Sequence, residues 1–361
     1  MKLIAQIQLK PTPEQAAALK ATLTAANAAC DFVSSLAWEH QEFGQFKLHK
    51  LAYYAAREKF GLSAQVTVRC IAKVADSYKL DKKTQRTFKP SGAISYDAHI
   101  LTFKPQAGTV SIWTMAGRQT IPYVAGEGQH AMLEAQRGES NLALIKGKFY
   151  LLACCEVSEA EPMPVKDVLG IDCGIVELAT DSSGKSYSGA QTKAVRRRYK
   201  RIRGLLQKRG TKSAKRHLRK LSKKQANFTK NENHCISKKI VKTATAEHKA
   251  LALENLKGIR ERGNGFNREM RWQMGNWAFA QLQSFITYKA QLAGVPVHFV
   301  EARNTSRTCS ACGHCEKANR KSQAQFLCKC CGCQLNADYN AALNIAARAP
   351  VNVPNVPTQK S

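Results

Sequence analysis

The pattern of hydrophobic and polar positions predicts strands and helices in separate blocks of the first 160 residues. Residues 1–10 alternate like a half-buried strand, and short β-type runs separated by glycine and polar turns fill residues 94–157. Between them lie three segments of helical periodicity, the first opened by the capping sequence Thr12-Pro13-Glu14-Gln15. This order predicts a small β-barrel that begins with the N-terminal strand and carries a helical insertion.

After a linker marked by Pro162 and Pro164, the pattern changes to strands followed by alternating strands and helices. The elements expected there are a strand at 168–173, a hairpin at 176–188, basic helices at about 193–246, a strand at 250–254, a helix at about 271–293, a strand at 295–300 and a helix at 337–347. This is the order of the ribonuclease H fold. The tail from Pro350 has no apolar periodicity, so we expect it to be disordered.

Composition adds an anionic partner to this picture. The chain has 361 residues, of which 44% are hydrophobic, and carries 56 Lys and Arg against 26 Asp and Glu. A compact protein with a formal charge of +30 repels itself unless a polyanion neutralises it, which points to nucleic acid. No stretch resembles a spanning helix of roughly 20 apolar residues or a signal peptide. We therefore expect a cytoplasmic, nucleoid-associated protein that does not bind membranes.

One segment concentrates this charge. Residues 191–230 contain seventeen Lys or Arg and no Asp or Glu, and Val195, Tyr199 and Ile202 repeat within it at helical spacing. A solvated face is the alternative, but uncompensated cations favour an amphipathic helix that lies along phosphates. The side chains expected to bind nucleic acid are Arg196, Arg197, Lys200, Arg203, Lys208, Lys215, Arg216, Arg219 and Lys223.

Seven of the thirteen cysteines fall between Cys309 and Cys333. In a reducing compartment such clustering indicates a metal rather than disulfides. Two CxxCG knuckles separated by fifteen residues have the spacing of a four-cysteine zinc ribbon, and a closed site of this kind is structural. The expected zinc ligands are Cys309, Cys312, Cys328 and Cys331. Participation of Cys315, Cys330 or Cys333 stays open, although the CxxCG register favours Cys328 and Cys331.

Three acids stand at the ends of elements. Asp172 and Glu254 each end an apolar strand, and Asp338 lies in the first turn of an Ala-rich helix. Each alone is as readily a helix cap or an ion-pair partner. Together they suit phosphodiester hydrolysis, which uses two divalent ions about 4 Å apart. Carboxylates are ligands for Mg²⁺, so we expect two Mg²⁺, with Mn²⁺ as a possible substitute.

At these residues the sequence resembles the TnpB proteins encoded by bacterial insertion sequences, relatives of the type V CRISPR effector nucleases. The matching segments are Gly170-Ile-Asp172-Cys-Gly174, Leu178-Ala-Thr180, Leu253-Glu254-Asn-Leu256, Thr305-Ser-Arg-Thr-Cys309-Ser-Ala-Cys312-Gly-His314 and Asn336-Ala-Asp338-Tyr-Asn340-Ala-Ala-Leu-Asn344. The opening Leu9-Lys-Pro-Thr-Pro-Glu-Gln15 also looks like the family. Cys173 and Glu177 are less usual around the first motif, but neither removes a carboxylate.

The resemblance implies an α+β multidomain fold: a wedge-like β-barrel with a helical recognition insertion, then a RuvC-like nuclease domain of the ribonuclease H fold, interrupted by a four-cysteine zinc ribbon. The corresponding boundaries are 1–10 and 90–160 for the barrel, 11–89 for the insertion, 166–303 and 336–349 for the nuclease domain, 304–335 for the ribbon and 350–361 for the tail. By the same analogy, Asp172, Glu254 and Asp338 are the catalytic carboxylates.

The function that the resemblance implies is RNA-guided cleavage of double-stranded DNA beside a short transposon-associated motif. The guide RNA would come from the transposon end, with one protein chain per RNA. A helix opening at Ser63 offers side chains suited to reading that motif, namely Ser63, Gln65, Thr67, Arg69 and Lys73, but ordinary helix-surface polarity explains them equally well. The alternatives are an RNA-guided repressor and a direct DNA-binding transposition factor that does not cut.

Overall fold

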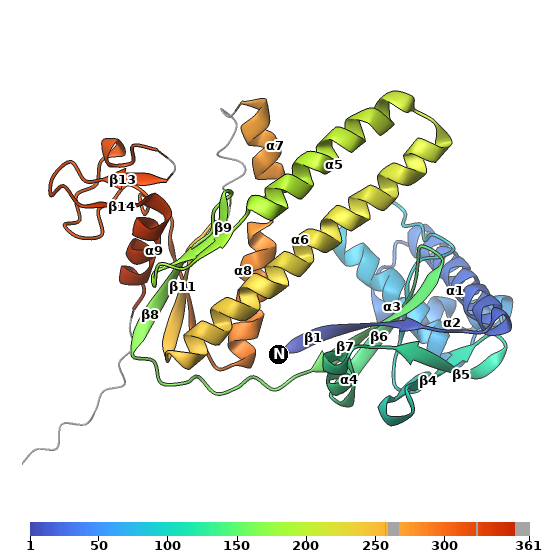
Figure 1. The fold of residues 1–361 in the computed structure, drawn as a ribbon. Coiled ribbons are helices and arrows are strands. Elements are labelled where there is room, and N and C mark those ends of the chain that lie inside the picture. The colour runs from blue at the N-terminus through green and yellow to red at the C-terminus, as the bar shows by residue number, and fades with distance from the viewer. Residues whose placement is uncertain (257, 259–266, 323, 351–361) are drawn as a thin grey trace, which may run out of the picture. The chain divides into compact units, whose positions relative to one another are not determined.

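The computed structural model describes residues 1–256, 258, 267–322 and 324–350. They form two compact units, divided between Ser158 and Glu159, which are described separately (Figure 1). From residue 351 on, the predicted tail lies outside the described residues. Within the described ranges, every helix is too short or too polar to cross a lipid bilayer.

The N-terminal unit is built on one antiparallel sheet of seven strands in the order β2-β6-β7-β1-β5-β4-β3. The strands are β1 (Lys2–Leu9), β2 (Ile94–Tyr96), β3 (Leu101–Lys104), β4 (Thr109–Thr114), β5 (Gly117–Val124), β6 (Gln136–Ile145) and β7 (Lys148–Glu156). The edge strands β2 and β3 are separated by only residues 97–100, so the sheet has to curl until its edges nearly meet. The Tyr96 hydroxyl of β2 donates to the carbonyl of Trp113 on β4, at 3.2 Å, which links the two ends of the strand order. The predicted barrel is therefore a nearly closed sheet.

Three helices, α1 (Pro13–Glu39), α2 (Gln45–Phe60) and α3 (Ala64–Leu80), leave this sheet after β1 and return to it at β2. The predicted capping box is confirmed, because the Thr12 hydroxyl accepts from the Gln15 N–H and the Gln15 side chain accepts from the Thr12 N–H. Leu19, Val74 and the strand residue Ile7 share one hydrophobic core. A short helix, α4 (Glu127–Glu134), which the sequence did not predict, and a 3-10 turn, η1 (Pro105–Ala107), complete the unit.

The C-terminal unit has a five-stranded sheet in the order β10-β9-β8-β11-β12. The strands are β8 (Asp167–Asp172), β9 (Glu177–Asp181), β10 (Ser186–Ser188), β11 (Lys249–Asn255) and β12 (Val297–Glu301). β8, β11 and β12 are parallel, whereas β9 and β10 are antiparallel to their neighbours. The apolar run of β11 is buried on both faces, as expected of a central parallel strand.

Helices cover both faces of this sheet (Figure 1). Leu251 and Leu253 share a core with residues of α6 (Lys212–Ala246) and α8 (Phe279–Leu292), whereas Ala250 and Ala252 pack with α9 (Ala337–Ala347). The alternation follows from the two-residue period of a strand. The β-hairpin of β13 (Gln325–Leu327) and β14 (Gln334–Asn336) leads directly into α9.

Two helical predictions need detail or correction. The basic segment is a hairpin of α5 (Ala190–Arg209) and α6, broken at Gly210, which takes a positive φ of 64° as a helix C-cap. The helix expected at about 271–293 is two helices, α7 (Arg268–Asn276) and α8, because Trp277 has extended backbone with ψ 112°. Trp277 is buried there against the ring of Phe279, so packing overrides the helical periodicity.

Gly170 of β8 lies directly against the backbone of α9. A Cβ at this position would overlap the carbonyl oxygen of Ala342 and lie 2.5 Å from the N–H nitrogen of Ala346. We therefore expect Gly170→Ala to lower the free energy of unfolding by about 1–3 kcal/mol or more, because both obstacles are backbone.

Gly204→Ala is the matched control. Gly204 lies within α5, and a Cβ added there would have no neighbouring atom within 4 Å, so alanine should stabilise the helix by roughly 0.5–1 kcal/mol. Urea unfolding of the two variants measures the difference. A Gly170→Ala protein as stable as the wild type would contradict the close packing of α9 on β8.

Candidate active site and candidate metal centre

The parallel pairing of β8 and β11 places two of the predicted acids at the same edge of the sheet. Asp172 ends β8, and Glu254 lies one residue beyond the Leu253–Ile171 pair that joins the two strands. Asp338 is the second residue of α9, whose N-terminus is capped by the Asn336 side chain. Because α9 packs on both strands, all three carboxyl groups lie at one end of the C-terminal unit.

These carboxyl groups influence one another electrostatically. Burial raises the pKa of Asp172 well above its usual range, and the charges of Glu254 and Asp338 raise it further. Burial also raises the pKa of Glu254, which is 7% exposed, against the opposing effect of its hydrogen bond from Thr305. Burial raises the pKa of Asp338 against the nearby Arg320 guanidinium. In the isolated chain the site therefore disfavours the charged form of all three carboxyl groups, and the neighbouring cations only partly offset this effect.

Glu254 is held by groups that the sequence did not single out. The Thr305 hydroxyl donates to Glu254 Oε1 at 2.5 Å, and the Gln283 amide of α8 donates to the Glu254 backbone carbonyl at 2.8 Å. Asn344 of α9 in turn donates to the Thr305 carbonyl at 2.8 Å. Thr305 and Asn344 lie in two of the matching segments, and that was the only signal for them.

Asp338 also has a partner that the sequence did not identify. Arg320 Nη2 lies 3.4 Å from Asp338 Oδ1, and the two side chains are 29% and 14% exposed. Arg320 stands between the two cysteine knuckles, so the segment that carries the cysteines reaches the acidic cluster directly.

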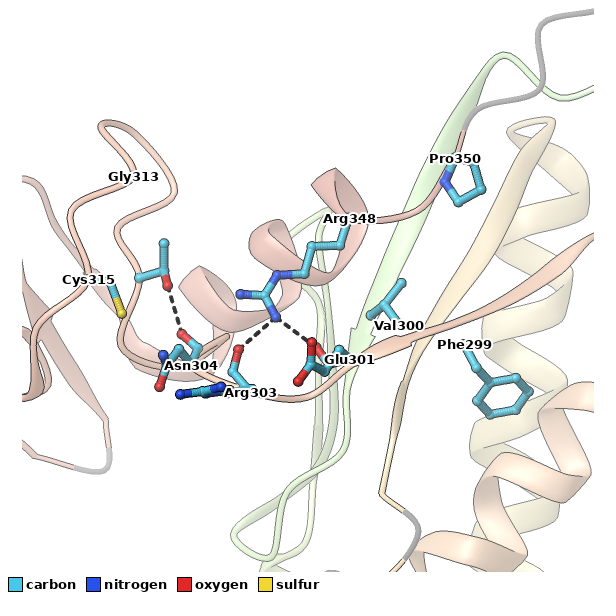
Figure 2. A pocket seen from close by; sticks show the side chains of 10 residues that line it. Phe299, Val300, Glu301, Arg303, Asn304, Gly313, Cys315, Arg348 and Pro350 are labelled. Carbon is cyan, nitrogen blue, oxygen red and sulfur yellow. Dashed lines mark hydrogen bonds between the residues drawn. The ribbon is translucent and has the colours of Figure 1, made fainter.

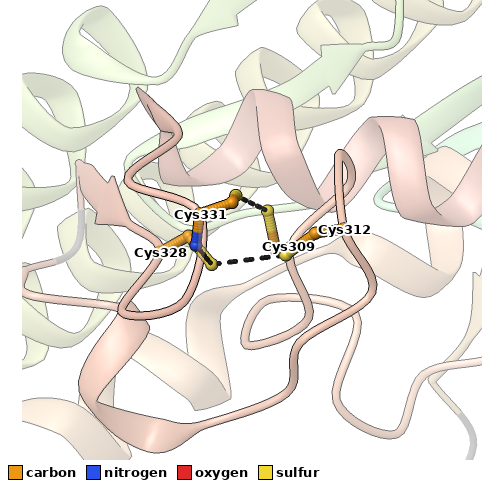
Figure 3. Close-up of side chains that lie close together, drawn as sticks. All are labelled: Cys309, Cys312, Cys328 and Cys331. Carbon is orange, nitrogen blue, oxygen red and sulfur yellow. Dashed lines mark hydrogen bonds between the residues drawn. The ribbon is translucent and has the colours of Figure 1, made fainter.

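The four predicted zinc ligands converge (Figure 3). Their sulfur atoms lie within 4.8 Å of one another, with 3.7 Å between Cys309 and Cys331 and 3.6 Å between Cys312 and Cys328. Tetrahedral zinc with Zn–S bonds of about 2.3 Å separates its sulfurs by about 3.8 Å, so the site fits this ion. Cys315, Cys330 and Cys333 are outside the group. Among the described residues, no other set of three His, Cys, Asp or Glu side chains converges this closely. The ligand atoms of Asp172, Glu254 and Asp338 are therefore more widely spaced than the four sulfurs.

The backbone favours a thiolate at Cys328, whereas burial and the neighbouring thiols raise the pKa values of Cys312 and Cys331. The N–H of Cys331 donates to Cys328 Sγ at 3.5 Å, and such backbone hydrogen bonds lower the pKa of Cys328 to about 6. Thiolate, not thiol, is the form that binds a metal. Gly313 and Gly332 follow the two knuckles with φ of 75° and 72°, which lets each turn close.

Asparagine side chains tie the cysteine-rich segment to α9. Asn340 donates to the Thr308 carbonyl at 2.8 Å and accepts from the Ser310 N–H at 3.0 Å, and Asn344 donates to Thr308 at 2.7 Å. Thr308 and Ser310 flank Cys309. These hydrogen bonds therefore fix the residues around Cys309 against the helix that carries Asp338.

A pocket opens beside this junction (Figure 2). Arg348, the C-cap of α9, donates from Nη1 to the backbone carbonyls of Glu301 and Arg303, at 2.7 and 2.8 Å. Its charge also counteracts the raised pKa of Glu254. Arg348 thus joins the end of β12 to the end of α9.

Comparisons with known proteins bear on this arrangement. Residues 153–259 match the OrfB_IS605 family, described as probable transposase, and residues 279–345 match the Cas12f1-like TNB domain. The chain is 39% identical over 140 residues to a CRISPR-associated endodeoxyribonuclease Cas12f1 of Sulfoacidibacillus thermotolerans, covering 38% of this chain and 30% of that protein. It is 33% identical over 112 residues to TnpB-like protein MJ0751 of Methanocaldococcus jannaschii, covering 31% of this chain and 40% of that protein. The resemblance to the TnpB family is confirmed.

The fold of the chain is similar to that of a solved protein. The protein of a Cas12f1–sgRNA–target DNA complex solved by cryo-EM matches with a TM-score of 0.63 at 17% identity, over 93% of this chain and 83% of that chain. The α+β fold is therefore similar to that of Cas12f1. The matched stretches span 30%, 49% and 42% of three curated Cas12f relatives, so this chain accounts for at most about half of each.

The nine basic side chains predicted to bind nucleic acid all lie on α5 or α6, but they differ in exposure. Arg196 is only 7% exposed, so its guanidinium is not presented to solvent in this conformation. Lys200 is exposed but engaged, with an ion pair of 2.7 Å to Glu269 and its ammonium 4.3 Å from the Trp272 ring centre, both on α7. Arg203 is half-buried. The exposed remainder are Arg197, Lys208, Lys215, Arg216, Arg219 and Lys223.

The side chains predicted to read a DNA motif make contacts inside the N-terminal unit. Ser63 caps α3, and Thr67 is fully buried and donates to the Ser63 carbonyl. Gln65 and Arg69 both bond Asp97, and Arg69 also pairs with Glu139. Lys73 donates to Asn27 Oδ1 at 2.6 Å and to the Ala93 carbonyl. All five side chains therefore have partners within the N-terminal unit, and DNA reading by them stays a prediction.

The four converging cysteines predict about one zinc per chain. Cys309→Ser should lose it, because one of four thiolates is removed, and should also loosen α9 through Asn340. Cys330→Ser is the matched control, since Cys330 lies in the same knuckle as Cys328 and Cys331 but outside the converging group. Elemental analysis of the purified proteins gives the zinc content. Full zinc occupancy in Cys309→Ser would refute the ligand assignment.

The raised pKa of Asp172 predicts a pH dependence of stability. A carboxyl group whose pKa is higher in the folded state takes up protons on folding, so its contribution to stability falls as pH rises from about 4 toward the raised pKa. In magnesium-free buffer, Asp172→Asn should therefore unfold at a higher temperature than the wild type, and the gap should be larger at pH 8 than at pH 5.

Asp167→Asn, at the exposed start of the same strand, controls for removing an aspartate charge. Differential scanning fluorimetry at the two pH values supplies the comparison. A gap that shrinks with rising pH would show that Asp172 is not penalised by burial in the folded chain.

Proposed function

We propose that the chain is an RNA-guided endonuclease that cuts double-stranded DNA beside a short transposon-associated motif and belongs to an insertion sequence. The observation that carries this is the meeting of Asp172, Glu254 and Asp338 at one edge of a sheet in a chain whose fold is similar to that of a Cas12f1 protein. The Cas12f1 structure contains a guide RNA and a target DNA, and one family match is described as a transposase.

In this proposal the three acids form a RuvC-like site for two Mg²⁺, which Mn²⁺ could replace. The residues fit these ions: all are oxygen donors, and burial raises the pKa of each, a cost to the charged carboxylate that a bound divalent cation would offset. Bound there, the ions would supply an activated water and stabilise the departing 3′ oxygen. A site for two ions also spans a wider group of ligands than a site for one, in keeping with the looser grouping of the acids.

The surrounding residues position these acids. Thr305 orients Glu254 through its hydroxyl, and Gln283 fixes the backbone carbonyl of the same residue. Arg320 lies against Asp338, where its charge also suits a phosphate of the substrate. The structural zinc acts at a distance, since the bonds of Asn340 and Asn344 hold α9 in register with the cysteine-rich segment.

The guide RNA, transcribed from the transposon end in this proposal, would bind one protein chain. The exposed cations of the α5–α6 hairpin would lie along its phosphates or those of the heteroduplex. The barrel at 1–10 and 90–160 with its insertion at 11–89 would serve as the wedge and recognition parts. Residues 166–303 and 336–349 would form the nuclease domain and 304–335 the zinc ribbon of a protein that works at the nucleoid.

A second candidate is a DNA-binding transposition factor or repressor that does not cut. The family match described as a transposase is compatible with it. Three intact acids, of which Glu254 is buried and Asp172 and Asp338 are partly buried, disfavour it, because burying carboxylates costs stability and mere binding does not require them.

Copurifying RNA and guided cleavage test the proposal together. Protein expressed with its flanking element should carry a structured RNA that directs cutting of a matching duplex in Mg²⁺. Affinity for the RNA should fall steeply with salt, with a log–log slope of about 0.7 to 0.9 per neutralised phosphate. Cutting of DNA by nuclease-treated protein alone would overturn the proposed guidance.

Single substitutions test the acids. Asp172→Ala, Glu254→Ala and Asp338→Ala should each abolish cleavage while target binding stays within several-fold of wild type, because binding uses the basic surface and base pairing. Their losses should not add, since residues that act as one unit fail together. Ca²⁺ should support cutting poorly, because its coordination is larger and looser.

Asp167→Ala is the control for this series, because Asp167 lies at the opposite end of β8 from Asp172. It should cut at nearly the wild-type rate. Quantified cleavage of a guided duplex and filter binding of the same duplex supply the two measurements. Wild-type cutting by any of the three acid variants would place the active site elsewhere.

A further inference from the structure

Helix α2 of the N-terminal unit carries aromatic side chains on its solvent side. Phe46 is 89% exposed and Tyr54 is 79% exposed, although both are residues that proteins usually cover at least in part. The opposite side of the helix supplies the core, through Leu48, Ala52 and Ala56, which are fully buried. The exposed rings are therefore not needed to hold α2 in place.

Two cations share this face with the rings. Lys50 and Arg57 are exposed, and neither forms an ion pair within the described residues. In order, Phe46, Lys50, Tyr54 and Arg57 stand four, four and three residues apart, which aligns them along one side of a helix. By contrast, Lys47 pairs with Glu42 at 2.7 Å, and Lys59 lies over the Phe32 ring. Aromatic and cationic side chains thus alternate along one stripe of α2.

We propose that this α2 stripe, Phe46, Lys50, Tyr54 and Arg57, binds a single-stranded stretch of the RNA that accompanies the protein. Bases stack on Phe46 and Tyr54, and phosphates lie against Lys50 and Arg57. A rise of about 1.5 Å per residue places the two rings roughly 12 Å apart along the helix, so each receives a separate base with Lys50 between them. The RNA partner rests on the proposed function; the stripe itself does not.

The chemistry of the stripe favours a single strand over the other occupants. Paired bases are stacked within a duplex and do not offer their faces, whereas unpaired bases stack on aromatic side chains. A second copy of a chain with a formal charge of +30 would bring Lys50 and Arg57 against like charges. RNA fits better than target DNA, because under the proposed function the RNA would accompany the protein and cover the two exposed rings before any target is bound.

The neighbouring helix α3 differs from α2 in this respect. Its side chains Gln65, Arg69 and Lys73 are engaged with Asp97, Glu139 and Asn27 within the unit.

The test uses the full chain in complex with its copurified RNA and the target DNA. Ultraviolet cross-linking followed by peptide mass spectrometry should place ribonucleotide adducts on Phe46 or Tyr54. Fluorescence anisotropy with a labelled oligouridylate of about 12 nucleotides, on RNA-stripped full chain, should show about tenfold or greater loss of affinity for Phe46→Ala/Tyr54→Ala. Lys50→Ala should lower the salt slope by about 0.7.

Leu80→Ala is the matched control, because Leu80 is an 88% exposed apolar residue at the end of α3. It should leave oligouridylate affinity unchanged. Circular dichroism checks the fold of each variant, which should be intact because the replaced side chains are exposed.

Three results would overturn the proposal. They are unchanged affinity in the double variant, deoxyribonucleotide adducts alone on the stripe, and a double variant that changes the sedimentation coefficient but not RNA binding. Guided cleavage by the wild type is scored separately. If the chain neither carries RNA nor cuts, the proposed function fails, whereas the oligouridylate arm still reports on the stripe.

Discussion

The close packing of α9 on β8 at Gly170 is the contact on which the C-terminal unit depends. It brings Asp338 to the strand ends that carry Asp172 and Glu254, and only a residue without a side chain allows the backbones to approach so far. The same helix holds the cysteine-rich segment through Asn340 and Asn344. A single helix therefore connects the acids, the sulfur cluster and the central sheet, and small changes in its position affect all three.

The chain contains two electrostatically unfavourable arrangements. The surface carries a large excess of cations, whereas the interior edge of the sheet collects three acids whose pKa values are raised chiefly by burial. Neither arrangement is favourable in the isolated chain. Under the proposed function, polyanions would satisfy the first and divalent cations the second, so the handling of phosphodiesters would account for both charge imbalances.

Much of this could be predicted from sequence because the signals are local. The knuckle spacing identified the four converging cysteines, and the apolar runs before Asp172 and Glu254 identified two strand ends. The break at Trp277 could not be predicted, because it depends on the burial of Trp277 in the core of the C-terminal unit, which periodicity does not encode. Thr305 and Gln283 were missed for a similar reason, since their hydrogen bonds to Glu254 join segments 51 and 29 residues apart. Likewise, the partners of Gln65 and Arg69 lie in strands and loops distant in the chain.

The pairing of β1 with β7 also has a consequence for how the protein is made. Lys2 lies opposite Glu156, so the first strand has no β7 partner until more than 150 residues have left the ribosome. The three helices that follow β1 contact one another over short sequence distances and can form much sooner. During synthesis the chain therefore carries a helical nucleus beside an unpaired strand, and an open edge of this kind invites pairing with other chains. The sheet of the N-terminal unit is therefore completed only after β7 has been synthesised, and until then the edge of β1 is open to pairing with other chains.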